Sequence, residues 1–183
     1  MRIISGKARG TKLYTLDGEN TRPTLDRVKE SLFNIIQNNV RDTVFLDLFS
    51  GSGAIGLEAL SRGVKKAIFC DKSKEACEII KKNIKKTHFE NDSVVYNEDF
   101  KIVLNKLKEK VDIIFLDPPY KTNFAIDAVK IILENNLIKE ESMIIIETDI
   151  KDELMEQLEN LNCNIYDIRK YGRAYIIFLK GGK

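Results

Sequence analysis

The stretch that decides the fold is Val44-Phe45-Leu46-Asp47-Leu48-Phe49-Ser50-Gly51-Ser52-Gly53-Ala54-Ile55-Gly56. Its first five residues form a short apolar run of strand type, and the glycines satisfy the pattern G-x-G-x-x-G ahead of a helical segment. Glycines are needed because the backbone must turn tightly and let a ligand approach to contact distance. The helix that follows offers unpaired N–H groups at its amino end. The stretch therefore predicts an open α/β sheet that binds a nucleotide-type ligand at the carboxyl end of this strand.

Strand and helix patterns alternate downstream of this stretch, which indicates a parallel sheet with helices on both faces. A helix is expected earlier, from Leu25 through Asn38, with Thr24 as its cap. The alternating elements are strand 44–48, helix 54–62, strand 66–70, helix 74–87, strand 93–97, helix 100–109, strand 111–116, helix 123–135, strand 143–148 and helix 151–160. Two further strands, 164–169 and 174–179, flank Tyr171-Gly172-Arg173 and predict a terminal hairpin, which adds an antiparallel strand. Tyr171 and Tyr175 are interpreted as core or rim aromatics.

The bulk composition predicts a single domain. The chain has 183 residues, of which 43% are hydrophobic, enough for one substantial core and too few for two ordinary domains. Residues 1–22 read as an amino-terminal hairpin or arm, and residues 23–183 as the α/β core. The net charge of +2 is uninformative, but residues 1–41 contain eight basic and four acidic side chains. This basic amino end predicts that one face of the protein binds a polyanion.

Cysteine usage and hydropathy restrict the cellular setting. The three cysteines form no C-x-x-C pair and are odd in number, so neither a disulfide framework nor a metal site is expected. No apolar run approaches the roughly 18 residues that span a bilayer, and the first residues lack a signal-peptide apolar region. A cytoplasmic protein without a membrane segment is expected.

The candidate cofactor site combines the glycine turn with carboxylates that follow the next two strands. Asp71 ends the second strand, where it would accept hydrogen bonds from both hydroxyls of a ribose, and Asp99 follows the third, placed for an adenine amino group. Asp47 would oppose a pyrophosphate but suits the cationic methionine end of S-adenosylmethionine, so this cofactor is predicted over NAD. The expected cofactor-binding residues are Asp47, Ser50, Gly51, Ser52, Gly53, Asp71, Lys72, Asp99 and Thr24.

A second motif, Asp117-Pro118-Pro119-Tyr120, follows the strand 111–116 and predicts a methylation site for an amino group. The exocyclic amine of a base is a poor nucleophile because its lone pair is delocalised into the ring. If the Asp117 carboxylate and the Pro118 carbonyl accept its two N–H hydrogens, the lone pair points at the methyl sulfonium. The prolines stiffen the turn, and Tyr120 offers a flat face for an extruded base. Proximity and alignment then supply most of the catalysis, without a metal.

With these motifs, the chain resembles the class I S-adenosylmethionine-dependent methyltransferases, and among them the small bacterial RsmD-type enzymes that methylate N2 of a guanine in 16S ribosomal RNA. The resemblance rests on Arg2-Ile3-Ile4-Ser5-Gly6-Lys7, on Arg22-Pro23-Thr24-Leu25-Asp26-Arg27, and on the glycine and Asp-Pro-Pro-Tyr motifs. It implies a Rossmann-like, seven-stranded, mostly parallel sheet with an antiparallel last strand. It also implies a monomer acting on the small ribosomal subunit.

The resemblance gives the basic amino end an RNA-binding role. Arg2, Lys7, Arg9 and Lys12 are expected to bind phosphates beside the target loop. Arg22, Thr24 and Arg27 are expected either over the methionine end of the cofactor or against RNA, and the sequence leaves both roles open. Two other functions stay open as well. One is a DNA adenine-N6 methyltransferase, which the Asp-Pro-Pro-Tyr motif would serve equally well, and the other is a catalytically silent RNA-binding assembly factor.

Overall fold

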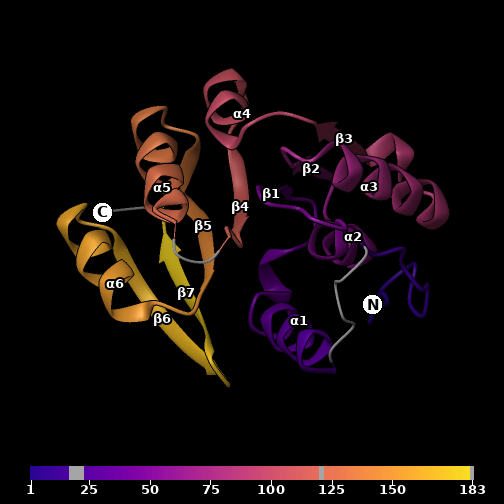
Figure 1. The fold of residues 1–183 in the computed structure, drawn as a ribbon, viewed down its shortest axis with the longest axis horizontal. Coiled ribbons are helices and arrows are strands. Elements are labelled where there is room, and N and C mark those ends of the chain that lie inside the picture. The colour runs from indigo at the N-terminus through magenta and orange to yellow at the C-terminus, as the bar shows by residue number, and fades with distance from the viewer. Residues whose placement is uncertain (17–22, 120–121, 182–183) are drawn as a thin grey trace. The chain divides into compact units, whose positions relative to one another are not determined.

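The computed structural model describes residues 1–16, 23–119 and 122–181, apart from the side chains of residues 23–25. The chain forms two compact units, Met1–Asp99 and Phe100–Lys183. The described residues contain seven strands, in a mostly parallel sheet whose last strand is antiparallel (Figure 1). This α/β, Rossmann-like fold confirms the predicted class.

The first unit contains three parallel strands in the order β3-β2-β1. Its helix α2 packs on β1 and β2, while α3 packs on β3. Phe45 of β1 and Phe69 of β2 are fully buried, so the core of this unit forms around the apolar strand residues. The elements are α1 Pro23–Ile35, the 3-10 helix η1 Gln37–Asn39, β1 Val44–Asp47, α2 Ala54–Ser61, β2 Lys66–Cys70, α3 Lys74–Thr87, the 3-10 helix η2 Glu90–Asp92 and β3 Ser93–Tyr96.

The second unit contains four strands in the order β4-β5-β7-β6. Strands β4 and β5 are parallel, and β7 is antiparallel to both β5 and β6. Helix α5 packs on β5 and between α4 and α6. The elements are α4 Phe100–Lys106, β4 Val111–Leu116, α5 Phe124–Glu134, β5 Ile138–Thr148, α6 Lys151–Asn160, β6 Asn164–Tyr171 and β7 Ala174–Lys180.

Several element boundaries differ from the sequence prediction, among them the end of α4, which lies at Lys106 and not at residue 109. Helix α1 begins at Pro23, so Thr24 lies inside its first turn and does not precede the helix as a cap. Proline is favoured at the first helical position because an N–H at that position would have no partner within the helix. The same helix ends at Ile35, and a 3-10 turn covers Gln37–Asn39. Strand β5 begins at Ile138, five residues before the predicted start, because a register shift in its pairing with β4 accommodates the charged residues 139–141.

The amino-terminal arm, residues 1–16, is a tight antiparallel loop. Arg2 and Lys12 form a single antiparallel bridge, and the Ile3 and Gly10 backbones add hydrogen bonds across it. The predicted hairpin is therefore short, and its continuation through residues 17–22 lies outside the described residues. A side chain at Gly6 would clash with the Ser61 carbonyl oxygen, 1.8 Å from the position of an added Cβ, so the arm lies directly on the end of α2.

Candidate active site

The glycine turn joins β1 to α2 in the first unit. Gly51 and Gly53 both have positive φ angles, 51° and 77°, a conformation that side chains other than glycine rarely adopt. The Gly53 N–H donates to the Ser50 carbonyl at 2.7 Å, which closes the turn just before the first residue of α2. The predicted strand, tight turn and helix are all present, in the predicted order.

Gly56, the third glycine, has a packing role. A Cβ on Gly56 would lie 2.4 Å from the ring of Phe69, which is fully buried in β2. Helix α2 therefore approaches β2 closely only because residue 56 has no side chain. This contact fixes the amino end of α2, and with it the glycine turn, against the sheet.

Asp47, the last residue of β1, is buried under the turn and only 2% exposed. Its Oδ2 accepts a hydrogen bond from the Gly56 N–H at 3.0 Å. Burial raises the pKa of the Asp47 carboxyl from 3.8 to about 7, against the lowering effect of that hydrogen bond, and the nearby Asp71 carboxylate raises it further. A cationic ligand next to the turn would reverse this effect and favour the carboxylate.

Replacing Asp47 with asparagine is expected to stabilise the cofactor-free protein above pH 7, by on the order of 2–4 kcal/mol, since one pKa unit corresponds to about 1.4 kcal/mol. Because the folded pKa of about 7 exceeds the unfolded value of 3.8, the stabilisation contributed by Asp47 is complete below about pH 4. It is lost as the pH rises through 7. Urea unfolding at pH 4, 6 and 8 measures the difference, and equal differences at pH 4 and pH 8 would contradict the assignment.

Asp71 lies directly after β2 and holds the glycine turn. Its Oδ2 accepts from the Gly51 N–H at 2.9 Å, and its Oδ1 accepts from the Ser73 N–H at 2.8 Å. The Asn97 side chain donates to the Asp71 and Lys72 carbonyls at 3.1 and 3.0 Å. The structure thus brings Asp71 next to the turn, as predicted. The sequence did not predict this role of Asn97, whose side chain holds the backbone of Asp71 and Lys72 in place.

Asp99 and Lys72 form an ion pair at the same edge of the first unit. Lys72 Nζ lies 3.8 Å from Asp99 Oδ2, and the lysine is largely exposed. Ser50 and Ser52 are buried, and Ser50 Oγ donates to the Asp47 carbonyl at 2.6 Å. The predicted cofactor residues that converge at the carboxyl ends of β1, β2 and β3 are Asp47, Ser50, Gly51, Ser52, Gly53, Asp71, Lys72 and Asp99.

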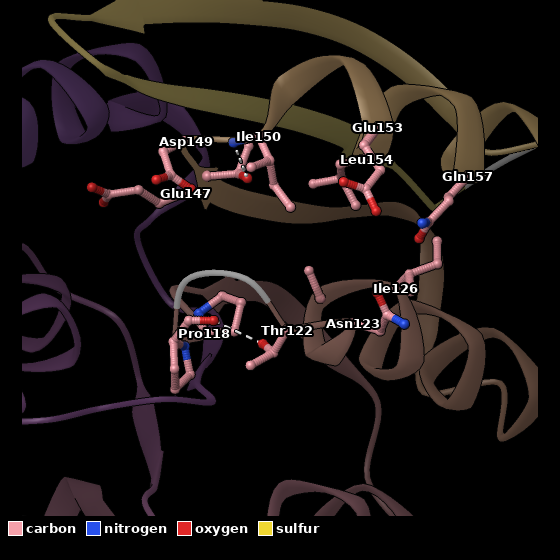
Figure 2. Close-up of a pocket in the computed structure, with 13 residues that line it drawn as sticks. Pro118, Thr122, Asn123, Ile126, Glu147, Asp149, Ile150, Glu153, Leu154 and Gln157 are labelled. Atoms are coloured by element: carbon pink, nitrogen blue, oxygen red, sulfur yellow. Dashed lines mark hydrogen bonds between the residues drawn. The ribbon is translucent and has the colours of Figure 1, made fainter.

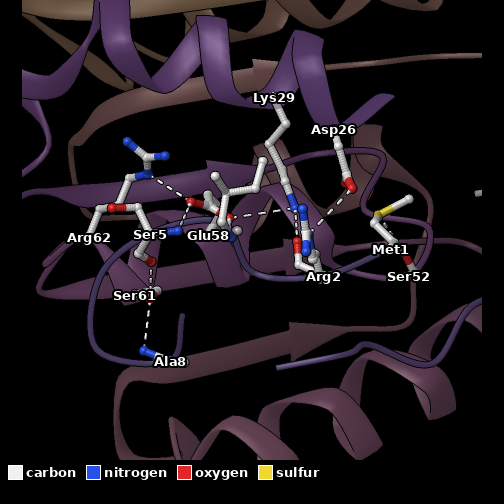
Figure 3. A network of polar contacts seen from close by, with 12 residues as sticks. Met1, Arg2, Ser5, Ala8, Asp26, Lys29, Ser52, Glu58, Ser61 and Arg62 are labelled. Atoms are coloured by element: carbon white, nitrogen blue, oxygen red, sulfur yellow. Dashed lines mark hydrogen bonds and ion pairs between the residues drawn. The ribbon is translucent and has the colours of Figure 1, made fainter. Parts of the chain in front are cut away.

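Glu58 anchors the amino-terminal arm to α2. This side chain is fully buried and accepts hydrogen bonds from the Ile4 N–H at 2.8 Å and the Ser5 N–H at 3.0 Å. It also pairs with Lys29 Nζ at 3.5 Å and with Arg62 Nε at 2.8 Å (Figure 3). Burial lowers the Lys29 pKa, although the Glu58 and Asp26 carboxylates oppose that shift. A glutamate inside an apolar helix was the available sequence signal for this network.

Asn83 makes a second anchor, and no pattern in the sequence predicted it. Its side-chain amide accepts from the Tyr14 N–H at 2.8 Å and donates to the Tyr14 carbonyl at 2.9 Å. The same amide donates to the Ser52 carbonyl at 2.9 Å, so one buried residue links the arm to the glycine turn. The arm consequently has a fixed position relative to the turn within the first unit.

The predicted RNA-binding residues are exposed wherever they are described. Arg2, Lys7, Arg9 and Lys12 are exposed on the arm, and Arg27 is exposed on α1. Arg2 Nε lies 4.0 Å from Asp26 Oδ2, a long and mostly exposed ion pair. Arg22 lies outside the described residues, and the side chain of Thr24 is likewise not described.

The Asp-Pro-Pro segment follows β4 in the second unit. Asp117 is exposed immediately after the buried Leu116, while Pro118 is half-buried. Thr122 Oγ1 donates to the Pro119 carbonyl at 2.7 Å, so Thr122 lies next to the second proline. The predicted position of Asp117, at the carboxyl end of a buried strand, is present, and Tyr120 lies outside the described residues.

A pocket adjoins this segment and holds about 410 Å³ of empty volume, including space open to solvent. Figure 2 shows Glu147 and Asp149 on one side and Pro118 and Thr122 on the other. Burial raises the pKa of the Glu147 carboxyl. Carboxylates beside the Asp-Pro-Pro turn give the pocket a set of hydrogen-bond acceptors.

Two further features are absent from the described residues. Among their helices, none has the length and apolar content needed to cross a membrane. Within the same residues, no three histidine, cysteine, aspartate or glutamate side chains cluster as a metal ion would require.

The fold and the glycine turn define a protein of the Rossmann-like methyltransferase class, and comparison with known proteins identifies its family. The chain belongs to the family described as Conserved hypothetical protein 95, whose model matches residues 1–180. It is 39% identical over 163 residues to the ribosomal RNA small subunit methyltransferase D of Haemophilus influenzae, spanning 87% of this chain and 84% of that one. The Escherichia coli protein of the same name is 33% identical, over 84% of this chain and 77% of that one.

A solved structure supports the same grouping. The Escherichia coli protein yhhF superposes with a TM-score of 0.85 and 29% identity, covering 100% of this chain and 99% of that one. The chain is therefore an S-adenosylmethionine-dependent methyltransferase of the RsmD type by family, as its motifs predicted. Membership of this family implies a methyl donor of the S-adenosylmethionine type.

Proposed function

We propose that this enzyme methylates the exocyclic N2 amine of a guanine in 16S ribosomal RNA, with the small ribosomal subunit as its partner. The observation that supports this most strongly is an exposed Asp117 at the carboxyl end of a buried strand, followed by two prolines, in a chain whose relatives are named small-subunit methyltransferases. Those names favour neither DNA adenine methylation nor a silent assembly role. The proposal includes that the enzyme acts in the cytoplasm and as a monomer.

The residues of the first unit fit an adenosine-containing methyl donor. The left-handed glycines leave no side chain over the turn, so a ligand can approach the backbone there. Asp71 would accept from the ribose hydroxyls while its present hydrogen bonds hold it in place. Asp47 would face the cationic methionine end, and Asp99 the adenine amine. When bound, the cofactor supplies an electrophilic methyl group.

The residues of the second unit fit an amine as the acceptor. The Asp117 carboxylate and the Pro118 carbonyl would accept the two N–H hydrogens of the amine, which turns its lone pair out of the ring. The acceptors of the adjoining pocket, Glu147 and Asp149, suit guanine because its edge carries N–H donors at both N1 and N2. Adenine offers an acceptor at N1 instead, so these carboxylates support guanine as the target.

The exposed basic residues of the arm would bind phosphates near the target. Arg2, Lys7, Arg9 and Lys12 are the proposed contacts on the arm, with Arg27 on α1 and Arg22 before it. Thr24 is proposed to approach the cofactor. Since phosphate contacts release condensed counterions, RNA binding through these residues should weaken steeply as salt increases.

Methyl transfer from isotopically labelled S-adenosylmethionine tests the function directly. Unmethylated small subunits, naked 16S RNA and duplex DNA are incubated in parallel, digested to nucleosides and analysed by mass spectrometry. We expect N2-methylguanosine from the ribosomal samples, and the ratio between particle and RNA identifies the substrate form. N6-methyladenine from DNA, or no transfer to any sample by protein that binds the cofactor, would overturn the proposal.

A further inference from the structure

A basic and aromatic cluster that the methyl-transfer chemistry does not use lies at the turn between β6 and β7 and includes Lys151, the first residue of α6. We call Lys151, Lys170, Arg173 and Tyr175 the hairpin-turn cluster. Lys170 and Arg173 are exposed on either side of Gly172, whose φ angle of 63° makes the turn tight. Figure 1 shows the two strands joining at one end of the second unit.

Two cations share one aromatic ring in this cluster. Lys170 Nζ lies 5.4 Å and Lys151 Nζ 5.7 Å from the centroid of the Tyr175 ring. Lys151 also lies 3.2 Å from Asp152 Oδ1, but that carboxylate is 94% exposed, so solvent screens the pair. The neighbouring Arg169 is already paired with Asp167 at 2.8 Å and is left out of the cluster. The positive charges of Lys151 and Lys170 are therefore concentrated beside the Tyr175 ring.

Strand register places this cluster beside the pocket. Lys170 pairs with Tyr175, and Tyr175 pairs with Thr148, so the three residues form one row across β6, β7 and β5. Thr148 also lines the pocket, together with Pro118 and Pro119. At about 4.8 Å between neighbouring strands, Lys170 lies roughly 10 Å from Thr148 along this row. That distance suits the backbone of a nucleotide next to a base held in the pocket.

The charges of the two neighbouring surfaces are opposite. The pocket presents Glu147, Asp149 and Glu153, which would repel phosphate but accept hydrogen bonds from a neutral base. The hairpin-turn cluster presents two lysines and an arginine, which attract phosphate. A polyanion whose base enters the pocket would therefore have its backbone drawn to the cluster.

We propose that the hairpin-turn cluster binds the phosphates of single-stranded RNA adjacent to the target nucleotide, with Tyr175 providing a face for a neighbouring base. Lysine and arginine beside aromatic rings hold unpaired strands through charge and stacking together, and the Tyr175 ring is half-buried beside its two lysines. The identity of the polyanion rests on the proposed function. The surface itself belongs to the second unit and is distinct from the basic arm of the first.

The hairpin offers a matched control for the test. Lys180 Nζ lies 5.5 Å from the Tyr166 ring, the same kind of contact on the same two strands. It is at the opposite end of β7, where Lys180 pairs with Asn164 of β6 and Met143 of β5. Lys170→Glu and Lys180→Glu therefore make the same charge change on the same hairpin, differing in their distance from the pocket.

The affinity for a 16S ribosomal RNA transcript, measured by fluorescence anisotropy at salt concentrations from 50 to 300 mM, tests whether the hairpin-turn cluster binds RNA. The double variant Lys170→Glu with Arg173→Glu should bind roughly 10- to 100-fold more weakly, with a salt slope smaller by about two, one for each phosphate that is no longer neutralised. Lys180→Glu should bind like the unaltered protein, and all variants should keep their affinity for S-adenosylmethionine. Unchanged RNA binding by the double variant, or equal losses in Lys170→Glu and Lys180→Glu, would overturn the inference.

The same samples separate this inference from the proposed function. If the unaltered protein makes N2-methylguanosine while the double variant binds RNA normally, the proposed RNA-binding role of the cluster is wrong and the proposed function is retained. If RNA binding depends on Lys170 and Arg173 but no guanine is methylated, the proposed function is wrong and the RNA-binding role of the cluster is retained. Thermal unfolding of each variant excludes loss of the fold as the reason for weak binding.

Discussion

Asp117→Ala is expected to lower the rate of methyl transfer by at least about 10²–10³-fold while leaving the affinity for S-adenosylmethionine unchanged. This range is the usual effect of removing one fixed hydrogen-bonding group that acts on the reacting atoms. The alanine variant leaves one N–H of the target amine without its acceptor, so the lone pair stays in conjugation with the ring. Because Asp117 is exposed and follows the end of β4, the fold should be preserved. Single-turnover methyl transfer and calorimetric cofactor binding measure the two quantities.

The chain provides a control on β4, the strand that ends just before Asp117. Asp112, near the start of β4, lies 2.7 Å from Lys139 Nζ, and Asp112→Ala should retain nearly full activity. Asp117→Asn keeps one acceptor and should fall between the unaltered protein and the alanine variant. Loss of cofactor binding in a folded Asp117→Ala protein would show that Asp117 acts on the cofactor and not on the amine.

Glu58→Ala is expected to lower the free energy of unfolding by about 3–5 kcal/mol, the usual effect of removing one partner from a buried ion pair. Lys29, only 3% exposed, would keep its hydrogen bond to the Arg2 carbonyl at 2.6 Å but would no longer face a carboxylate. The Ile4 and Ser5 N–H groups would lose their acceptor as well. For a chain of this size the melting temperature should fall by roughly 6–20 °C. Thermal and urea unfolding measure the change.

Glu78→Ala serves as the surface comparison. Glu78 pairs with Lys81 at 3.2 Å, but both side chains are more than half exposed. Its replacement should change the free energy of unfolding by no more than about 0.5 kcal/mol. If Glu58→Ala melted within about two degrees of the unaltered protein, a shift far below that range, Glu58 would not anchor the arm as the structure indicates.

The apolar pattern was sufficient to predict the fold because each core strand is a nearly continuous hydrophobic run. The residues of β1, β2 and β4 are almost all buried, as expected for parallel strands covered on both faces. The glycine turn was equally visible, since only glycine fits both the left-handed turn and the space beside Phe69. The antiparallel last strand followed from the terminal hairpin. These features depend on neighbours in the sequence, which a pattern can reveal.

The missed features depend on residues that are distant in the sequence. Glu58 meets Ile4 and Ser5 across more than 50 residues, and Asn83 meets Tyr14 across 69. No local pattern specifies such partners. The early start of β5 was hidden for a different reason: Ser142 Oγ accepts from the Lys139 N–H and donates to the Val111 carbonyl, which satisfies the backbone of a charged bulge. The functional roles of the site residues remain predictions that the experiments above will test.

The long-range anchoring of the arm has a consequence for how the protein is made. Tyr14 cannot meet Asn83 until 69 more residues have been added to the nascent chain. At about 5–20 residues per second, this delay lasts roughly 3–14 s. Loop closure takes far less than a second, so translation and not diffusion sets the time at which the arm docks. During that interval the arm is a tethered basic peptide beside the ribosome that is synthesising it.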